Sequence, residues 1–227
     1  MSLADRIARV QDAIAAAAAR SGRPANAVRL VAVTKTVASE RIAEAYALGV
    51  RDFGENRVQE AQPKIAALAA QGLRPVWHLV GHLQTNKAAA ALRSFDILEA
   101  VDSLRLAEAI SRRVTGTPAR ILLEVNVAGE PSKFGFRLDD PQQPFADAVA
   151  AIRALPGLLV EGLMTVAPIA ENPEEVRPVF RRLAELAAAF QLRELSMGMT
   201  DDFPIAIEEG ATMVRIGRAI FGERPSP

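Results

Sequence analysis

Lysines are few in this chain, and one of them stands where an amine could react. The sequence has 23 arginines (27 basic residues less four lysines), and the lysines are Lys35, Lys64, Lys87 and Lys133. Lys35 follows the apolar residues 30–33 in the segment LVAVTKT, so we expect it at the end of a buried strand. A partly desolvated amine attacks carbonyl carbon, a role that a guanidinium does not fill. Lys35 is therefore the candidate for a Schiff base, although most lysines are simply solvated.

Two glycine-containing segments near the C-terminus are suited to hold an anion. In MVRIGRAIFG, Gly217 follows Arg215 and precedes a short helical stretch that starts near Arg218. In LSMGMTDD, Ser196 supplies a hydroxyl and Gly198 allows close approach of the backbone. N–H groups at the start of a helix bind phosphate, and α/β barrels often place phosphate after their last two strands. An ordinary strand-to-helix turn would show the same glycine pattern.

Eight apolar runs of β type are the elements that would position these residues. They are residues 29–34, 52–54, 76–80, 97–101, 120–127, 159–166, 194–197 and 213–216. Between them lie segments of helical period, among them residues 39–48, 103–114, 141–155 and 174–190. This α/β rhythm without a linker favours a single (β/α)8 TIM barrel over an open doubly wound sheet. We expect one domain, residues 1–227, with an additional amphipathic N-terminal helix.

The alternation of side chains along a strand predicts which polar residues face the barrel lumen. Glu124 and Asn126 share one face of their strand against an apolar set, and Ser196 and Arg215 also stand against apolar neighbours. Lys35, Asn126, Ser196 and Arg215 are predicted to point inward near the C-terminal strand ends, where barrel enzymes place their sites. Glu124 is the one carboxylate that we expect as a polar contact in the lumen.

The composition narrows the partners and the compartment. The 27 basic and 27 acidic residues cancel, which leaves no overall positive field for nucleic acid or an anionic membrane. No apolar stretch is long enough to span a bilayer. Cysteine is absent, which excludes disulfides, thiolate zinc sites and a cysteine nucleophile. We expect a cytoplasmic protein without a nucleic-acid or membrane partner.

Two further groups of polar residues receive structural interpretations. His78 and His82 have H-x-x-x-H spacing, but a predicted strand and Gly81 remove the helical geometry that chelation needs, so we expect no metal site. His78 is expected to line the barrel mouth. Asp201 and Asp202 precede Phe-Pro, which indicates capping of a helix.

A lysine on the first strand and a phosphate site after the last two would suit a carbonyl compound that carries a phosphate. Pyridoxal 5'-phosphate (PLP) has both groups. Phosphorylated sugar substrates of Schiff-base aldolases have them as well. The residues by themselves leave both chemistries open.

Six segments of the chain identify a family. They are AVTKT at 32–36, FGENRVQE at 53–60, WHLVGHLQTNK at 77–87, GLMTV at 162–166, LSMGMTDDF at 195–203 and VRIGRAIFG at 214–222. Together they resemble the YggS/PROSC family of pyridoxal phosphate homeostasis proteins, whose fold is related to the N-terminal barrel of alanine racemase. The resemblance extends from end to end, and several such segments in order are far more specific than any one of them.

The resemblance implies a role for each candidate residue. Lys35 would form the Schiff base with PLP, and Arg215 would face the pyridine nitrogen. The other cofactor-binding residues that it implies are Ser196, Gly217 and the backbone of Arg218 at the phosphate, and Asn56 and Met197 along the cofactor.

Three positions depart from the family pattern. Arg218 stands where a small hydroxyl residue is usual, which removes one side-chain hydroxyl from the phosphate site. Thr200 replaces the usual Ser and keeps the hydroxyl. Phe134 follows Lys133 where a small residue is common, so we expect the nearby loop to close differently.

The resemblance implies a PLP holder without robust catalysis. An arginine beside the pyridine nitrogen keeps that nitrogen unprotonated, because two positive charges repel. Racemases need an acid/base on each face of the substrate, and in related racemases the second is a tyrosine of an additional C-terminal domain. We expect no such domain because the sequence ends at Pro227, and Tyr46, the one tyrosine, is expected to pack in a helix.

The expected function is therefore that of a monomer that buffers or delivers PLP. Apo forms of PLP-dependent enzymes are the further partners that this role implies. The alternative is an enzyme, either a PLP-dependent amino-acid racemase or decarboxylase, or a Schiff-base aldolase.

Overall fold

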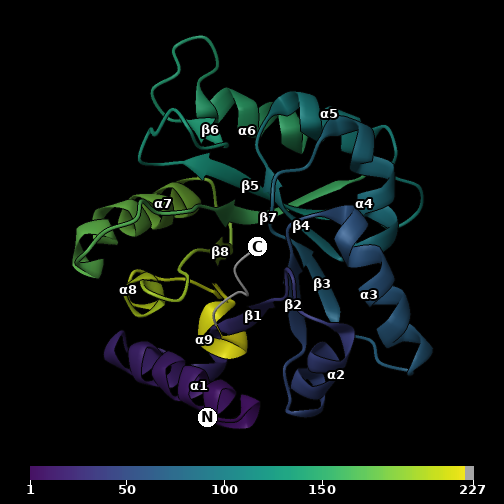
Figure 1. The fold of residues 1–227 in the computed structure, drawn as a ribbon. Coiled ribbons are helices and arrows are strands. Elements are labelled where there is room, and N and C mark those ends of the chain that lie inside the picture. The colour runs from purple at the N-terminus through teal and green to yellow at the C-terminus, as the bar shows by residue number, and fades with distance from the viewer. Residues whose placement is uncertain (223–227) are drawn as a thin grey trace.

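Parallel strands joined by helical crossovers close into a ring, and the helices lie outside it (Figure 1). The structure is a computed structural model that describes residues 1–222. Within this range the eight barrel strands are β1 (Arg29–Val33), β2 (Asp52–Glu55), β3 (Val76–Leu79), β4 (Ile97–Val101), β5 (Ala119–Asn126), β7 (Leu158–Met164), β8 (Glu194–Ser196) and β9 (Met213–Ile216). They pair in chain order, and the pairing of β9 with β1 closes the barrel.

The helices follow the strands along the chain. They are α1 (Leu3–Arg20), α2 (Ser39–Ala47), α3 (Val58–Ala70), α4 (Ala88–Ser94), α5 (Leu104–Ser111), α6 (Phe145–Arg153), α7 (Arg177–Ala189), α8 (Phe203–Glu208) and α9 (Arg218–Phe221). Short 3-10 turns span Ala25–Ala27, Thr85–Lys87 and Pro173–Val176. Among the described residues, no helix is both long enough and apolar enough to cross a membrane.

Helix α1 is the additional N-terminal helix, and it begins at a capping box. The hydroxyl of Ser2 accepts a hydrogen bond from the Asp5 N–H, and the Ser2 N–H donates to the Asp5 carboxylate. These bonds satisfy N–H groups that a helix start otherwise leaves unpaired. Its buried face, which includes Ile7 and Ile14, packs against α8 and α9. The helix thus covers the side of the barrel on which the first strand, β1, pairs with the last, β9.

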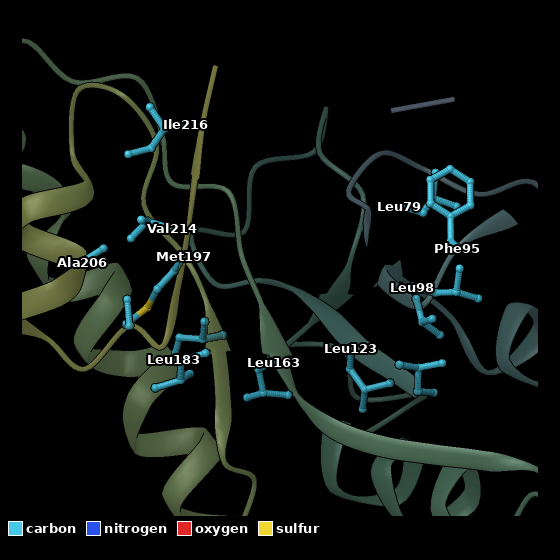
Figure 2. Packing of buried hydrophobic residues seen from close by; sticks show 14 of the residues in the cluster. Leu79, Phe95, Leu98, Leu123, Leu163, Leu183, Met197, Ala206, Val214 and Ile216 are labelled. Carbon is cyan, nitrogen blue, oxygen red and sulfur yellow. The ribbon is translucent and has the colours of Figure 1, made fainter. Parts of the chain in front are cut away.

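Two apolar layers hold the barrel together. The outer one fills the space between sheet and helices, as Figure 2 shows for Leu163, Leu183, Met197 and Val214. The inner one lies in the lumen and consists of Val31, Ile97, Ala100, Leu122, Met164 and Met213. Neighbouring residues of a strand belong to different layers, as Val31 and Ala32 of β1 and Leu122 and Leu123 of β5 do.

The expected barrel with its N-terminal helix is confirmed, with differences at the element ends. Every predicted strand is present within two residues of its expected limits. The short strand β6 (Phe136–Arg137), which pairs with β5, was not predicted. The expected helix 141–155 begins only at Phe145, because Pro144 disfavours a helical conformation in the residue before it. The ring of Tyr46 packs under the Arg51 guanidinium at 4.4 Å, in line with its expected packing role.

Candidate functional site

The end of β1 holds Lys35 in a fixed backbone segment. The preceding Thr34 donates its hydroxyl to the Glu55 carboxylate at 2.6 Å, and the Lys64 amine donates to the Thr34 carbonyl at 2.8 Å and to Glu55 at 2.7 Å. Thr36, which follows, has a φ of +66°, in the left-handed region that β-branched residues rarely adopt. The Val37 N–H donates to the Thr34 carbonyl at 2.9 Å and closes the turn around Lys35, which is itself half-buried.

Lys35 lines a cavity of about 580 Å³ at the ends of β1 and β9. The opposite wall includes Gly217 and Arg218, at the start of α9. A Cβ added at Gly217 would lie 3.1 Å from the Val33 carbonyl oxygen, so a side chain there would crowd β1. The cavity volume falls within the usual range of small-molecule sites, about 300–1,000 Å³.

Arg215 lies two residues before Gly217 and points into the barrel lumen. Its guanidinium donates to the Ser196 hydroxyl at 2.6 Å and to the Thr165 carbonyl at 2.8 Å. Ser196 in turn donates to the Glu99 carboxylate at 2.5 Å. Burial lowers the pKa of Arg215, although Glu99 and other carboxylates oppose that shift. The structure therefore brings Ser196 and Arg215 together, and the Ser196 hydroxyl is engaged inside the lumen.

Glu99 and the contacts of His78 were not predicted from the sequence. The His78 ring contacts Glu99 through Nδ1 at 2.5 Å and Asp52 through Nε2 at 3.0 Å. Burial lowers the pKa of His78, but the hydrogen bonds and charges of the two carboxylates outweigh burial and raise it to about 9. Burial raises the pKa of Glu99, and its contacts with His78 and Arg215 bring it below its ordinary value.

His78 is fully buried, so the expectation that it lines the barrel mouth is wrong. Its two carboxylate partners hold it within the lumen.

Glu124 is the carboxylate that was expected in the lumen, and its surroundings are unusual. Its side chain is buried, and within residues 1–222 one of its oxygens has no hydrogen-bond partner. Burial, assisted by the negative charge of Asp102, raises the pKa of Glu124 to about 7, while Arg215 acts in the opposite direction. Near neutral pH this carboxyl therefore exists in both protonation states.

Like Ser196 and Arg215, three other predicted residues are not among those that line the Lys35 cavity. Asn56 borders a neighbouring pocket of about 360 Å³. Asn126 uses its side chain to close the following loop, accepting from the Glu130 N–H at 3.1 Å and donating to its carbonyl at 2.8 Å. Met197 is fully buried in the outer apolar layer (Figure 2). Any contact of Met197 with a ligand would therefore come from its backbone.

The loops around the barrel mouth are tied to one another. The ring of Phe134 stacks on His82 at 3.9 Å between ring centres, and His82 contacts Asp102 at 2.8 Å. This stacking gives a physical reason for the aromatic residue at position 134. Within residues 1–222 no group of three or more His, Asp or Glu side chains is arranged to hold a metal ion.

The two aspartates before α8 differ from the capping expectation. Asp202 occupies the N-cap position of α8, but its carboxylate accepts from the Met199 N–H at 2.5 Å instead of from the helix. Asp201 forms an ion pair with Arg218. These contacts connect the loop after β8 with the start of α9.

The arrangement combines three chemical groups, two of which line the Lys35 cavity, whereas Arg215 is not among its lining residues. The Lys35 amine can condense with an aldehyde, and the backbone at Gly217 permits close approach of a ligand. Arg215 places a positive charge within the lumen. A small molecule with a carbonyl and an anionic group matches these features.

Known proteins share both the sequence and the fold. Residues 7–225 match the family described as alanine racemase, N-terminal domain. The pyridoxal phosphate homeostasis protein of Aquifex aeolicus is 42% identical, with 99% of each chain covered. The structure of PipY from Synechococcus elongatus, with PLP bound, superimposes with a TM-score of 0.83 at 36% identity, covering 97% of this chain and 100% of that chain.

A more distant similarity concerns the fold alone. Alanine racemase from Corynebacterium glutamicum has a TM-score of 0.69 at 21% identity, covering 98% of this chain and 62% of that chain. The sequence identity and coverage of the nearer relatives are decisive for the family. The chain belongs to the pyridoxal phosphate homeostasis proteins, within the family of the alanine racemase N-terminal domain.

Proposed function

We propose that this chain holds PLP as a reversible Schiff base on Lys35 and contributes to intracellular PLP homeostasis. The observation that carries the proposal is the half-buried lysine at the edge of a cavity of about 580 Å³, with Gly217 and Arg218 on its other wall. The PLP-bound structure of the similar PipY supports the same ligand. The family relation favours PLP over the phosphorylated sugars of an aldolase.

The residues at the cavity fit the phosphate end of the cofactor. Gly217 keeps the wall free of a side chain that would crowd β1, and the backbone at Arg218 begins α9. The Arg218 guanidinium contacts Asp201, and it would add positive charge near a bound phosphate. Ser196 donates its hydroxyl proton to Glu99 and accepts from Arg215, so we propose that it borders the cofactor while keeping both contacts.

The lumen side of the site fits the ring of the cofactor. Arg215 is fixed by Ser196 and the Thr165 carbonyl, and we propose that it faces the pyridine nitrogen. A guanidinium at that place disfavours protonation of the nitrogen. Asn56 and the backbone of Met197 are proposed to line the ring.

A storage or delivery role requires a bond that forms and breaks easily. Bound PLP supplies an aldehyde, which condenses with the lysine amine to form a C=N bond with release of one water, and hydrolysis reverses the step. The Thr34, Glu55 and Lys64 cluster holds the backbone that carries the amine. We propose that residues 1–227 act as one monomeric cytoplasmic unit without robust catalysis, and that apo PLP-dependent enzymes receive the cofactor.

Absorbance spectroscopy tests the proposal directly. Purified protein incubated with PLP should develop the visible band of a lysine Schiff base, and Lys35→Ala should lose it. Borohydride reduction followed by peptide mapping should place the cofactor mass on Lys35, a clear assignment in a chain with four lysines. Absence of the band in the wild type, or its retention in Lys35→Ala, contradicts the proposal. Lys35-dependent turnover of amino acids would favour an enzyme instead.

A further inference from the structure

A continuous series of polar contacts crosses the barrel lumen. It passes from Asp52 to His78 (3.0 Å), to Glu99 (2.5 Å), to Ser196 (2.5 Å) and to Arg215 (2.6 Å). These residues come from β2, β3, β4, β8 and β9, so the contacts join opposite sides of the barrel. We refer to these five residues as the lumen chain.

The two ends of the lumen chain lie in different surroundings. Asp52 is the first residue of β2, its side chain is 17% exposed, and it borders a pocket of about 410 Å³. Arg215 approaches the C-terminal end of β9, two residues before the cavity residue Gly217. The chain therefore connects the end of the barrel opposite Lys35 with the proposed cofactor side.

The charges of the lumen chain alternate in sign. His78, whose pKa is raised to about 9, is a cation at neutral pH between the carboxylates of Asp52 and Glu99. Arg215 is faced by the negative charges of Glu99, Glu124 and Asp202. Glu99 is the one member that lies between both cations. Its removal would leave two buried positive charges without their common partner.

Glu99 also fixes the direction of the Ser196 hydroxyl. Ser196 donates its single proton to Glu99, which leaves its lone pairs for the Arg215 N–H at 2.6 Å. With an amide in place of the carboxylate, an N–H can donate to Ser196 and turn the hydroxyl proton toward the guanidinium. Both the charge and the hydrogen-bond direction therefore depend on Glu99.

We propose that Glu99 is a positioning residue for Arg215, holding the guanidinium through Ser196 in the orientation that faces the cofactor ring. The inference rests on the proposed PLP function for its last step. The order of the lumen chain itself rests only on the contacts among the five residues.

The first test uses the cofactor-free protein, so it does not depend on PLP binding. His78 and His82 are the only histidines, and the NMR titration of their ring protons can therefore be assigned with single variants. Glu99→Gln should lower the His78 midpoint by about 1–3 pH units, the usual effect of losing one close opposite charge. An unchanged midpoint in a folded variant overturns the order of the lumen chain.

The second test measures PLP binding by a double-mutant cycle. Glu99→Gln should keep the Schiff-base band, because Lys35 is intact, but shift its maximum and raise the dissociation constant by about tenfold. If Glu99 acts through Arg215, the double variant Glu99→Gln with Arg215→Gln should bind PLP no more weakly than Arg215→Gln alone. Additive losses, or wild-type binding by a folded Glu99→Gln protein, overturn the proposal.

Two variants keep this test decisive. Glu99→Asp retains the charge, and hence the balance needed for folding, but withdraws the carboxylate from Ser196, so it should weaken PLP binding in the same direction. Glu161→Gln alters another carboxylate with a buried oxygen, on β7, which pairs with Arg120 outside the lumen chain, and it should bind PLP like the wild type. Wild-type binding by Glu99→Asp contradicts the inference. Absence of a band in the wild type contradicts the proposed function but leaves the histidine titration valid.

Discussion

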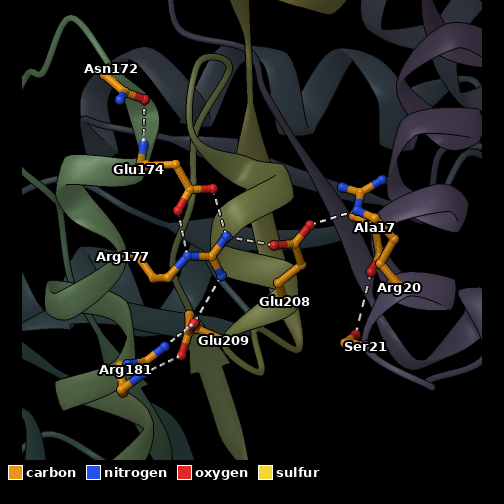
Figure 3. Close-up of polar contacts among 9 residues, drawn as sticks. All are labelled: Ala17, Arg20, Ser21, Asn172, Glu174, Arg177, Arg181, Glu208 and Glu209. Atoms are coloured by element: carbon orange, nitrogen blue, oxygen red, sulfur yellow. Dashed lines mark hydrogen bonds and ion pairs between the residues drawn. The ribbon is translucent and has the colours of Figure 1, made fainter.

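Two charged networks in this molecule both pair carboxylates with basic side chains, but one lies at the surface and the other inside the barrel. In the surface cluster, Arg177 contacts Glu174 at 2.6 Å, Glu208 at 2.7 Å and Glu209 at 2.9 Å, as Figure 3 shows. The contacts extend to Arg181 and Arg20, so the cluster joins α7 to the end of α8 and to α1. In the lumen chain, Glu99 and His78 have no exposure to solvent. The distances are similar, but the surroundings of the charges differ.

Exposure decides what each network can do. Water and salt ions stabilise a surface charge that loses its partner, so single contacts there contribute little. A buried charge without a partner has no such substitute, so the lumen chain must keep its alternation of signs. The surface cluster is therefore suited to fastening helices, whereas the lumen chain is suited to fixing the position of one functional group.

The largest expected difference between the networks appears when a carboxylate is removed. Glu99→Ala should lower the free energy of unfolding by about 3–5 kcal/mol, because His78 and Arg215 stay buried without the carboxylate that lies between them. Glu174→Ala in the surface cluster is the matched change and should have a much smaller effect, since its side chain is 54% exposed. Urea denaturation of both variants measures this. Equal losses would show that burial does not separate the networks.

The two networks should also differ in their response to rising pH, although the lowered pKa of Glu99 makes the lumen chain weaken in acid as the surface cluster does. The folded-state pKa of His78 is about 9, above its ordinary 6.5, so its contribution is complete below pH 6.5 and is lost as the pH rises through 9. Glu124, raised from 4.5 to about 7, likewise contributes below pH 4.5 and loses that contribution as the pH rises through 7. Each shift corresponds to about 3 kcal/mol. The pKa values of Glu208 and Glu209 are lowered, so the surface cluster weakens as the pH falls below 4.5.

Denaturation curves between pH 4 and pH 10 check these signs. Glu124→Gln should abolish the loss of stability between pH 4.5 and 7 and leave the loss between pH 6.5 and 9. His78→Gln should do the reverse. A wild-type protein that gains stability from pH 7 to pH 9 would contradict the assignment of a charged imidazole in the lumen.

The smallest expected effect concerns salt. Arg177→Ala should lower the free energy of unfolding by about 1 kcal/mol, because water still reaches its three partners, whose side chains are 54%, 20% and 12% exposed. This difference between variant and wild type should shrink when the salt concentration rises from about 0.05 M to about 1 M. The deficit of Glu99→Ala should stay the same. A salt-dependent deficit for Glu99→Ala would place its charge in contact with solvent.

Sequence reasoning was most effective where structure depends on local alternation. Because inward and outward residues alternate in a barrel strand, the lumen position of Arg215 and Ser196 followed from their apolar neighbours. Barrel closure and side-chain rotamers decide which residues meet across the lumen. The periodicity of a single strand predicts neither of them. Glu99 was missed for this reason, since it lies in an otherwise apolar strand. Lys64 was missed because it reaches Thr34 from a helix that follows another strand.

The left-handed conformation of Thr36 has a consequence for protein engineering. A β-branched residue in this region carries a backbone strain of about 1–3 kcal/mol, which the surrounding contacts must hold in place. A residue tolerant of that conformation would relieve the strain and raise the melting temperature of the apoprotein. It would also loosen the segment that presents Lys35. At this turn, thermal stability of the apoprotein and a fixed position of the Lys35 backbone are therefore competing design goals.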